Sequence, residues 1–255
     1  MSGWTALLLA GSRPSGDPLA SSMGVAHKAL IPVGGEPMLL RPLRTLLGND
    51  TIATVVVLTQ DPADLEPVLP ADGRTAVRAS RESIAETLEQ LIITRSVGFP
   101  ILVTTADHAL LDEQMLTEFI AEADGADLAI AVVERSALMA RLPQTKRTWL
   151  AFRGGAYSGA NLFALGSVKA LSAIEMWRSV EQDRKKGWRV LSVLGPALLL
   201  GAVLRMRTLD QSVAGLARKL GMTARAVVLS NPLAAVDVDK PVDHAIVEAI
   251  LAGKA

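Results

Sequence analysis

Short apolar runs alternate with helical patterns through the first half of the chain, and this alternation constrains the fold more than any other feature. Strands are expected at residues 4–10, 52–59, 75–79, 99–105 and 128–133, and the first two of them are expected to be buried. Helices are expected between them, because apolar residues recur at helical spacing over 37–47, 84–92 and 112–120. Strands joined through helices usually lie parallel in one sheet. The pattern therefore predicts an α/β fold with a mostly parallel central sheet flanked by helices.

The composition agrees with such a sheet and excludes several classes of protein. Hydrophobic residues make up 50% of the chain but aromatic residues only 4%, so the core is aliphatic, as in parallel sheets covered on both faces. Lysine plus arginine and aspartate plus glutamate number 26 each, so the formal net charge is zero. A nonspecific nucleic-acid binder is expected to be basic. The absence of cysteine excludes disulfides, thiolate metal sites and a cysteine nucleophile.

Neither a leader nor a membrane span is expected. No basic residue precedes the short apolar run 6–10, so the N-terminus does not resemble a signal peptide. The longest apolar stretch, 193–204, is interrupted by Gly195 and Pro196 and is too short to cross a bilayer. These features predict a cytoplasmic protein.

The second half of the chain is less regular. A polar connection is expected over 136–146, and the remaining elements are strands at 147–152, 161–164 and 226–230 and helices at 167–180, 191–204, 210–220 and 241–251. A glycine-rich segment, 154–159, separates the first two of these strands. With no repeat and no low-complexity linker, residues 1–255 are expected to form one domain that carries a helical insertion over about 165–222.

The loop after the first strand is rich in glycine, which lets backbone N–H groups approach a phosphate closely. Gly11 and Gly16 have the spacing of a P-loop, but Asp17 and Pro18 stand where that motif needs lysine and a hydroxyl residue. The Rossmann glycine pattern is absent as well. On composition alone, the loop is equally compatible with a simple connection.

The continuation of this loop carries a family resemblance. A strand ending in Leu-Ala-Gly11 precedes Met23-Gly24-x-x-x-Lys28, and an apolar pair, glycine and Pro37-Met-Leu follow. This order resembles the nucleotidyltransferases with a Rossmannoid GT-A-like fold, most closely the molybdopterin-guanylyltransferase-like (MobA-like) group.

The resemblance implies that the glycine-rich loop binds the nucleotide and that the lysine neutralises phosphate charge. On this chain the loop residues are Ala10, Gly11 and Ser12, and the lysine is Lys28. The family usually has a second glycine at Ser12 and an arginine at Ser22. Arg13 is the candidate to supply that missing charge.

Asp107 ends a buried strand, where the family carries an Asp-x-Pro-like metal-binding segment. Carboxylate oxygens suit Mg²⁺ or Mn²⁺. The alternative, that Asp107 only caps the next turn, is weakened because Asp112 is the better cap for the following helix. His108 is expected to be a solvated neighbour.

The segment Ala235 to Asp243 resembles the family's closing Asp-x-Asp-Thr-Pro-Glu-Asp sequence. In an extended chain Asp237 and Asp239 point to the same side and are expected to share one cation, together with Asp107. The alternative is an aspartate-rich helix start, in which Asp243 favours the helix dipole. We expect Asp243 to be structural and the other two to be metal ligands.

The resemblance also suggests residues for the base and the acceptor. Ser80 and Ser83 lie where family members contact base and ribose, although alone Ser80 reads as a helix N-cap. The candidates for acceptor binding are Lys146, Arg147, Ser158, Gly159, Asn161, Lys185 and Lys186. The alternative for the basic residues is a solvated surface.

Together these residues predict a Mg²⁺- or Mn²⁺-dependent enzyme. It would transfer a nucleoside monophosphate from an NTP (CTP or GTP) to a small, phosphorylated acceptor and release pyrophosphate. Two alternatives stay open: a GT-A glycosyltransferase that uses a nucleotide sugar, and a catalytically silent nucleotide-binding module. Pyrophosphate release separates both from the main prediction.

Overall fold

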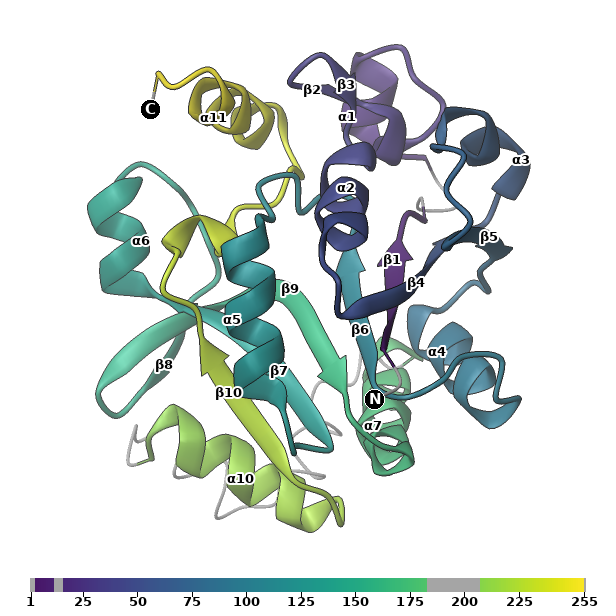
Figure 1. Cartoon of the computed structure of the whole chain (residues 1–255). Helices are drawn as coiled ribbons and strands as arrows, with labels where there is room; N and C mark the ends of the chain where they lie inside the picture. Colours follow the sequence, from purple (N-terminus) through teal and green to yellow (C-terminus); the bar gives the residue numbers. More distant parts are fainter. Residues whose placement is uncertain (1–2, 12–15, 183–206, 255) are drawn as a thin grey trace.

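The computed structural model describes residues 3–11, 16–182 and 207–254. Within these residues, an eight-stranded sheet has the order β10-β7-β9-β6-β1-β4-β5, and β8 pairs with β9 outside this path (Figure 1). The strands are β1 Trp4–Leu9, β4 Ile52–Thr59, β5 Thr75–Ala79, β6 Ile101–Thr105, β7 Leu128–Glu134, β8 Leu150–Phe152, β9 Gly155–Leu165 and β10 Ala224–Val228.

The sheet is mostly parallel. β1 pairs in parallel with β4 and β6, β4 with β5, and β7 with β10. β9 runs antiparallel to β6, β7 and β8. The predicted α/β architecture is confirmed. Because the parallel strands share one direction, their carboxyl ends meet at one edge, toward which the arrowheads of β1 and β6 point in Figure 1.

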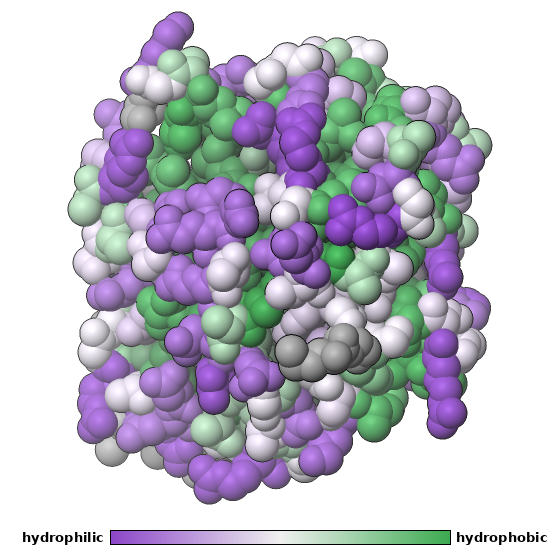
Figure 2. All heavy atoms as spheres, viewed as in Figure 1, coloured by the Kyte–Doolittle hydropathy of each residue, from purple (hydrophilic) through white to green (hydrophobic). Residues whose placement is uncertain are grey.

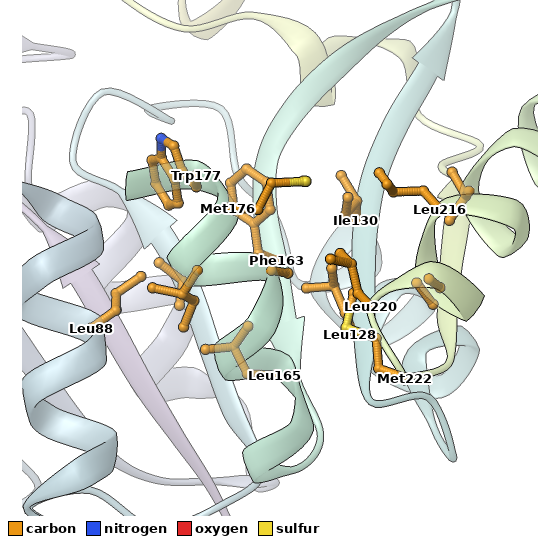
Figure 3. Close-up of a pocket in the computed structure, with 16 residues that line it drawn as sticks. Leu88, Leu128, Ile130, Phe163, Leu165, Met176, Trp177, Leu216, Leu220 and Met222 are labelled. Atoms are coloured by element: carbon orange, nitrogen blue, oxygen red, sulfur yellow. The ribbon is translucent and has the colours of Figure 1, made fainter. Parts of the chain in front are cut away.

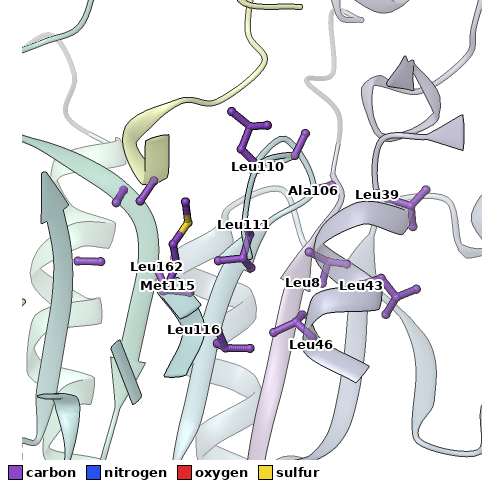
Figure 4. Close-up of a cluster of buried hydrophobic side chains, with 14 of the residues drawn as sticks. Leu8, Leu39, Leu43, Leu46, Ala106, Leu110, Leu111, Met115, Leu116 and Leu162 are labelled. Carbon is purple, nitrogen blue, oxygen red and sulfur yellow. The ribbon is translucent and has the colours of Figure 1, made fainter. Parts of the chain in front are cut away.

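Helices cover both faces of the sheet and bury an aliphatic core against each. One face is covered by α2 (Leu40–Gly48) and α5 (Glu113–Ala123), the other by α4 (Ile84–Ile93) and α7 (Leu171–Gln182). Figure 4 shows Leu43 and Leu46 of α2 and Leu116 of α5 around Leu8 of β1. The next residue along β1, Leu7, packs in the cluster of the opposite face. This alternation is what a strand buried on both sides requires.

The remaining elements lie around this layered centre. α10 packs along the edge strand β10, and α11 packs against the small β2–β3 hairpin. The remaining helices are α1 Pro18–Ser22, α3 Pro62–Leu65, α6 Arg135–Arg141, α10 Leu209–Lys219 and α11 Pro241–Leu251. The 3-10 turns are η1 Lys28–Leu30, η2 Glu66–Val68, η3 Val168–Ala170 and η4 Pro232–Ala235. The hairpin strands are β2 Pro32–Val33 and β3 Glu36–Pro37.

The surface is mixed in character. On the face seen in Figure 2, hydrophilic side chains alternate with smaller hydrophobic areas. No helix in the described part of the chain is long and apolar enough to cross a bilayer.

Two predicted helix starts are wrong. Pro37 was expected to open a helix, but α2 begins at Leu40. The reason is a tight turn at Gly34 and Gly35, whose φ values of +63° and +84° suit a two-residue hairpin loop and put Pro37 in β3. Ser80 was expected to cap α4, but Ser83 does so, since its Oγ accepts the Glu86 N–H at 3.3 Å.

Two segments of the second half also differ from expectation. The polar connection expected over 136–146 contains α6, which is anchored by one fully buried side chain, Leu138. The glycine-rich segment 154–159 belongs mostly to β9 rather than separating two strands. The predicted helix at 191–204 lies outside the described residues, as does the middle of the predicted insertion 165–222.

Candidate functional site

A short helix and a glycine turn precede Lys28 and bring it to the carboxyl edge of the sheet. α1 ends at Ser22, and Gly24 follows it with a φ of +70° that L side chains rarely adopt. The Val25 N–H donates to Ala20 O across this turn at 3.1 Å. η1 then begins at Lys28. The glycine of the Met-Gly-x-x-x-Lys motif therefore has a structural reason, because it reverses the chain and presents the lysine.

Lys28 joins two carboxylates from segments far apart in the sequence. Its Nζ donates to Asp107 Oδ2 at 2.6 Å and also to Asp239 Oδ1. Asp107 follows β6 and Asp239 precedes α11. Burial by itself lowers the pKa of Lys28, but the charges and hydrogen bonds of Asp107 and Asp239 outweigh it and raise that pKa above the ordinary lysine value. Lys28 is therefore charged at neutral pH.

The backbone also ties these segments together, since the Val238 N–H donates to Asp107 O at 3.1 Å. At this edge, Asp107 Oδ1, Thr105 Oγ1 and Ser80 Oγ are buried and have no hydrogen-bond partner among the described residues. Buried polar atoms without partners are uncommon, and functional sites are one reason for them. Sequence reasoning missed Thr105, whose only signal is its place at a strand end two residues before Asp107.

Asp237 has a different set of partners from Asp239. Arg147 Nη1 donates to Asp237 Oδ1, and Asn161 Nδ2 donates to Asp237 Oδ2 at 3.3 Å. Arg147 Nη2 reaches Asp243 Oδ1 at 3.4 Å. Burial raises the pKa of Asp237 above the ordinary aspartate value, although Arg147 opposes the shift. The two aspartates that were expected to share one cation thus contact two different cationic side chains.

A cavity of about 730 Å³ lies beside this pair. Asp237 and Asp239 line it, so Asp239 links the cavity to Lys28. Five of the seven candidate acceptor residues line it as well: Lys146, Arg147, Ser158, Gly159 and Asn161. Lys240, which sequence reasoning missed although it directly follows Asp239, is also part of its wall.

The other candidates are placed as follows. Ala10 and Gly11 directly follow β1, and the Ala10 N–H donates to Leu58 O at 2.8 Å. A Cβ at Gly11 would come within 2.9 Å of the Gln60 side chain. The oxygen of Ser83 is used in capping α4. The remaining candidates, Ser12, Arg13, Lys185 and Lys186, lie outside the described residues.

His108 is not solvated, as the sequence led us to expect, but fully buried. The loop after β6 turns inward, with the Leu111 N–H donating to His108 O at 3.0 Å. Burial lowers the pKa of His108 to about 4, so the ring is neutral at pH 7. Because the His108 ring is neutral, it supplies no positive charge to the neighbouring Asp107. The Asp107 carboxylate contacts the charged Lys28 ammonium instead.

The carboxylates fit a divalent cation in part. Asp107 and Asp239 already bracket one positive group, the Lys28 ammonium, and offer the oxygen ligands that Mg²⁺ prefers. Among the described residues, no group of three or more histidine, aspartate or glutamate side chains could hold a metal ion. The pair therefore suits a cation that takes its other ligands from a bound phosphate, as Mg²⁺ commonly does.

A second cavity, of about 220 Å³, is chemically different. It lies between α4, α7, α10 and the sheet, and Figure 3 shows Leu88, Phe163, Trp177 and Leu216 around it. All the described side chains that line it are apolar. These described side chains offer no group for catalysis or for binding a charged ligand.

Solved structures of transferases are similar to this chain. The chain is similar to a hypothetical transferase from Thermus thermophilus, with a TM-score of 0.79, 31% identity and coverage of 95% of this chain and 99% of that one. It also resembles 4-diphosphocytidyl-2C-methyl-D-erythritol synthase from Anaerococcus prevotii, with a TM-score of 0.59, 11% identity and coverage of 99% and 100%.

A third similar structure is 2-C-methyl-D-erythritol 4-phosphate cytidylyltransferase from Thermus thermophilus, with a TM-score of 0.54, 13% identity and coverage of 98% and 99%. Residues 6–197 match the MobA-like NTP transferase domain. The chain belongs to this family, and the resemblance found in its motifs is confirmed. A search of curated proteins found no match.

Proposed function

We propose that this protein transfers a nucleoside monophosphate from CTP or GTP to a small, anionic acceptor and releases pyrophosphate. The observation that carries the proposal is the cluster of Lys28, Asp107 and Asp239 at the carboxyl edge of the sheet, where Asp239 also faces the 730 Å³ cavity. Ligands of open α/β sheets bind at this edge. Membership in the NTP transferase family supports a triphosphate as the donor.

The nucleotide is assigned to the side of the site formed by the ends of β1, β5 and β6. Ala10 and Gly11 directly follow β1, and Ser12 and Arg13 come next in the sequence. Ser80 follows β5 and has a buried hydroxyl without a hydrogen-bond partner in the described chain. Such a hydroxyl suits a contact to ribose or base. Ser83, which caps α4, then acts by holding the start of the helix.

The transfer requires in-line displacement at the α-phosphorus. An acceptor oxygen forms a new P–O bond, the bond to the bridging oxygen of pyrophosphate breaks, and pyrophosphate leaves with that electron pair. Lys28 stabilises the negative charge on the phosphates through its ammonium. Mg²⁺, when bound by Asp107 and Asp239 together with the phosphates, would supply further charge neutralisation. An acceptor that is already an anionic phosphate needs no general base.

The acceptor is assigned to the 730 Å³ cavity. Lys146 and Lys240 line it and form no ion pair with other described residues, so both can bind an anionic group. Charge-assisted hydrogen bonds to phosphate are among the stronger polar contacts. Arg147 also lines the cavity, but its guanidinium already contacts Asp237 and Asp243. We assign Arg147 the role of holding Asp237 in place.

The experiment that tests the proposal is a screen for pyrophosphate release. Each of the four NTPs is incubated with Mg²⁺ and phosphorylated sugars, polyols, isoprenoid precursors or pterins. Acceptor-dependent pyrophosphate from CTP or GTP supports the proposal. Transfer of a sugar from a nucleotide sugar, or nucleotide binding with no turnover for any acceptor, would contradict it.

A further inference from the structure

The Lys28 ammonium occupies the position between two carboxylates that a divalent cation would take. It donates to Asp107 Oδ2 at 2.6 Å and to Asp239 Oδ1, and its side chain is only 15% exposed. Lys28 therefore bridges the two carboxylates as a cation would. The same two carboxylates are the ones that suit Mg²⁺.

We infer that Lys28 competes with the divalent cation for Asp107 and Asp239, so that the protein binds this cation weakly until an NTP draws Lys28 away. This inference rests on the proposed function, because it takes the metal and the triphosphate from it. It assigns Lys28 a second role, which is to make metal binding depend on the nucleotide.

Charge and hydrogen bonding both make the two cations exclude each other. An ammonium in contact with both carboxylates repels a second positive ion at the same place, and solvent screens this repulsion weakly on the side of Asp107, whose side chain is 18% exposed. Asp107 Oδ1 is buried without a hydrogen-bond partner among the described residues. Once Lys28 leaves, Asp107 therefore offers both of its oxygens to a cation.

The neighbouring carboxylates, Asp237 and Asp243, are engaged by other groups and do not offer the cation an alternative site. Asp237 is held by Arg147 and by Asn161. Asp243 contacts Arg147 and accepts the Lys240 N–H at 3.0 Å. A cation that enters beside Lys28 thus finds these two carboxylates engaged by other groups.

The triphosphate removes the competition by offering Lys28 a better partner. Its phosphates carry several negative charges in a small volume, and a lysine at the end of a flexible side chain can turn toward them. The cation then takes the two carboxylates and the phosphate oxygens together. Nucleotide and metal are therefore expected to increase each other's affinity, because such coupling is reciprocal.

The test measures Mn²⁺ binding directly, from the electron paramagnetic resonance signal of free Mn²⁺, and needs no turnover. Lys28→Met is expected to bind Mn²⁺ at least about 10-fold more tightly than wild type without nucleotide, since one repulsive charge is removed at contact distance. Lys146→Met is the matched control, because it removes the same charge from the wall of the 730 Å³ cavity that Asp239 also lines. Its affinity should stay within about threefold of wild type, as expected for an exposed charge screened by salt.

Two further arms locate the effect. Adding Asp107→Asn to Lys28→Met should abolish the gain in Mn²⁺ affinity. Adding CTP or GTP should bring wild type to the affinity of Lys28→Met or beyond. Lys28→Gln, which keeps a hydrogen-bond donor without the charge, serves as a second variant if Lys28→Met unfolds.

The inference is overturned if neither Lys28 variant binds Mn²⁺ more tightly than wild type, or if Lys146→Met shows an equal gain. Failure of the proposed function has a different signature. In that case pyrophosphate release is absent from wild type, whatever the nucleotide-free Mn²⁺ titrations show.

Discussion

The Arg147 guanidinium donates hydrogen bonds to both the carboxylate and the main-chain carbonyl of Asp237. Nη1 donates to Asp237 Oδ1, and Nη2 donates to Asp237 O at 3.3 Å. The Arg147 side chain is 10% exposed, and it contacts Asp243 in the first turn of α11 as well. Arg147 thus links the loop between α6 and β8 to the segment that carries Asp237 and Asp239. Arg147, Asp237 and Asp243 all line the 730 Å³ cavity.

Replacing Arg147 should therefore cost stability and acceptor binding together. Arg147→Gln leaves two largely buried carboxylates without their counter-charge, and breaking a buried pair typically costs about 3 kcal/mol. Urea denaturation measures this loss. Lys146→Gln, a change at the exposed neighbouring position, should stay within about 0.5 kcal/mol of wild type. Equal stability of the two variants would show that the contact contributes little.

Asp107→Asn should reduce turnover by at least about 100-fold while the fold survives, because it keeps the shape and removes the charge that faces Lys28 and the metal. Steady-state pyrophosphate release gives the rate, and thermal denaturation checks the fold. Asp124→Asn, the same change at the exposed end of α5, is the control and should be near wild type. Normal metal-dependent turnover in Asp107→Asn would remove Asp107 from the site.

Lys28→Met should lower kcat more than it weakens nucleotide binding, since the ammonium stabilises charge that grows in the transition state. We expect a fall in kcat of at least about 100-fold and a change in nucleotide Kd below about 10-fold. Single-turnover rates and calorimetric titration measure the two quantities. If Kd rises as much as kcat falls, Lys28 serves only to bind the nucleotide.

Lys146→Gln combined with Lys240→Gln should raise the acceptor KM and leave the nucleotide Kd unchanged. A charge-assisted contact contributes roughly 1.5–3 kcal/mol, or about one to two decades of affinity. Lys169→Gln, an exposed lysine that contacts Asp127 rather than the cavity, is the control. Loss of nucleotide affinity instead would assign the two lysines to the triphosphate.

Asp127 should make the fold sensitive to acid. The hydrogen bond from Ser167 Oγ at 2.6 Å and that from the Thr223 N–H at 2.8 Å lower its pKa to about 2. A carboxyl with a depressed folded-state pKa stabilises the fold above its unfolded pKa, near 3.8, and this contribution is lost as the pH falls toward 2.

Urea denaturation between pH 5 and pH 2 measures this contribution. The difference in unfolding free energy between wild type and Asp127→Asn should shrink across the window from about pH 4 to about pH 2. A difference that stays constant over this window would show that Asp127 titrates alike in both states.

The strands were the part of the fold most easily predicted from sequence. The runs at 52–59 and 75–79 are strands with the same bounds in the structure. The first is a mostly buried strand of apolar and β-branched residues, whereas the second is a partly exposed strand at the edge of the sheet. α6 and the β2–β3 hairpin could not be predicted this way. α6 depends on one buried side chain, Leu138, and the hairpin depends on a glycine pair whose φ values composition does not reveal.

The site divides in a similar way. Lys28 and Asp107 stand in recognisable local motifs, so the sequence points to both, although not to their contact across 79 positions. The pairing of Arg147 with Asp237 spans 90 positions and has no local pattern. The spacing of Asp237 and Asp239 predicted one shared cation, whereas the fold brings a different cationic side chain to each.

The most direct test of the proposed nucleotidyl transfer is the stoichiometry of the reaction with one acceptor that passes the screen. Wild-type protein, Mg²⁺, CTP or GTP and the acceptor are incubated together, and products are identified by mass spectrometry. The proposal predicts one pyrophosphate for each acceptor molecule that gains one nucleoside monophosphate. The mass of the product should equal the mass of the acceptor plus that of the nucleoside monophosphate, minus one water. Nucleoside diphosphate with orthophosphate, or an acceptor that gains a phosphate or a sugar instead, would contradict it.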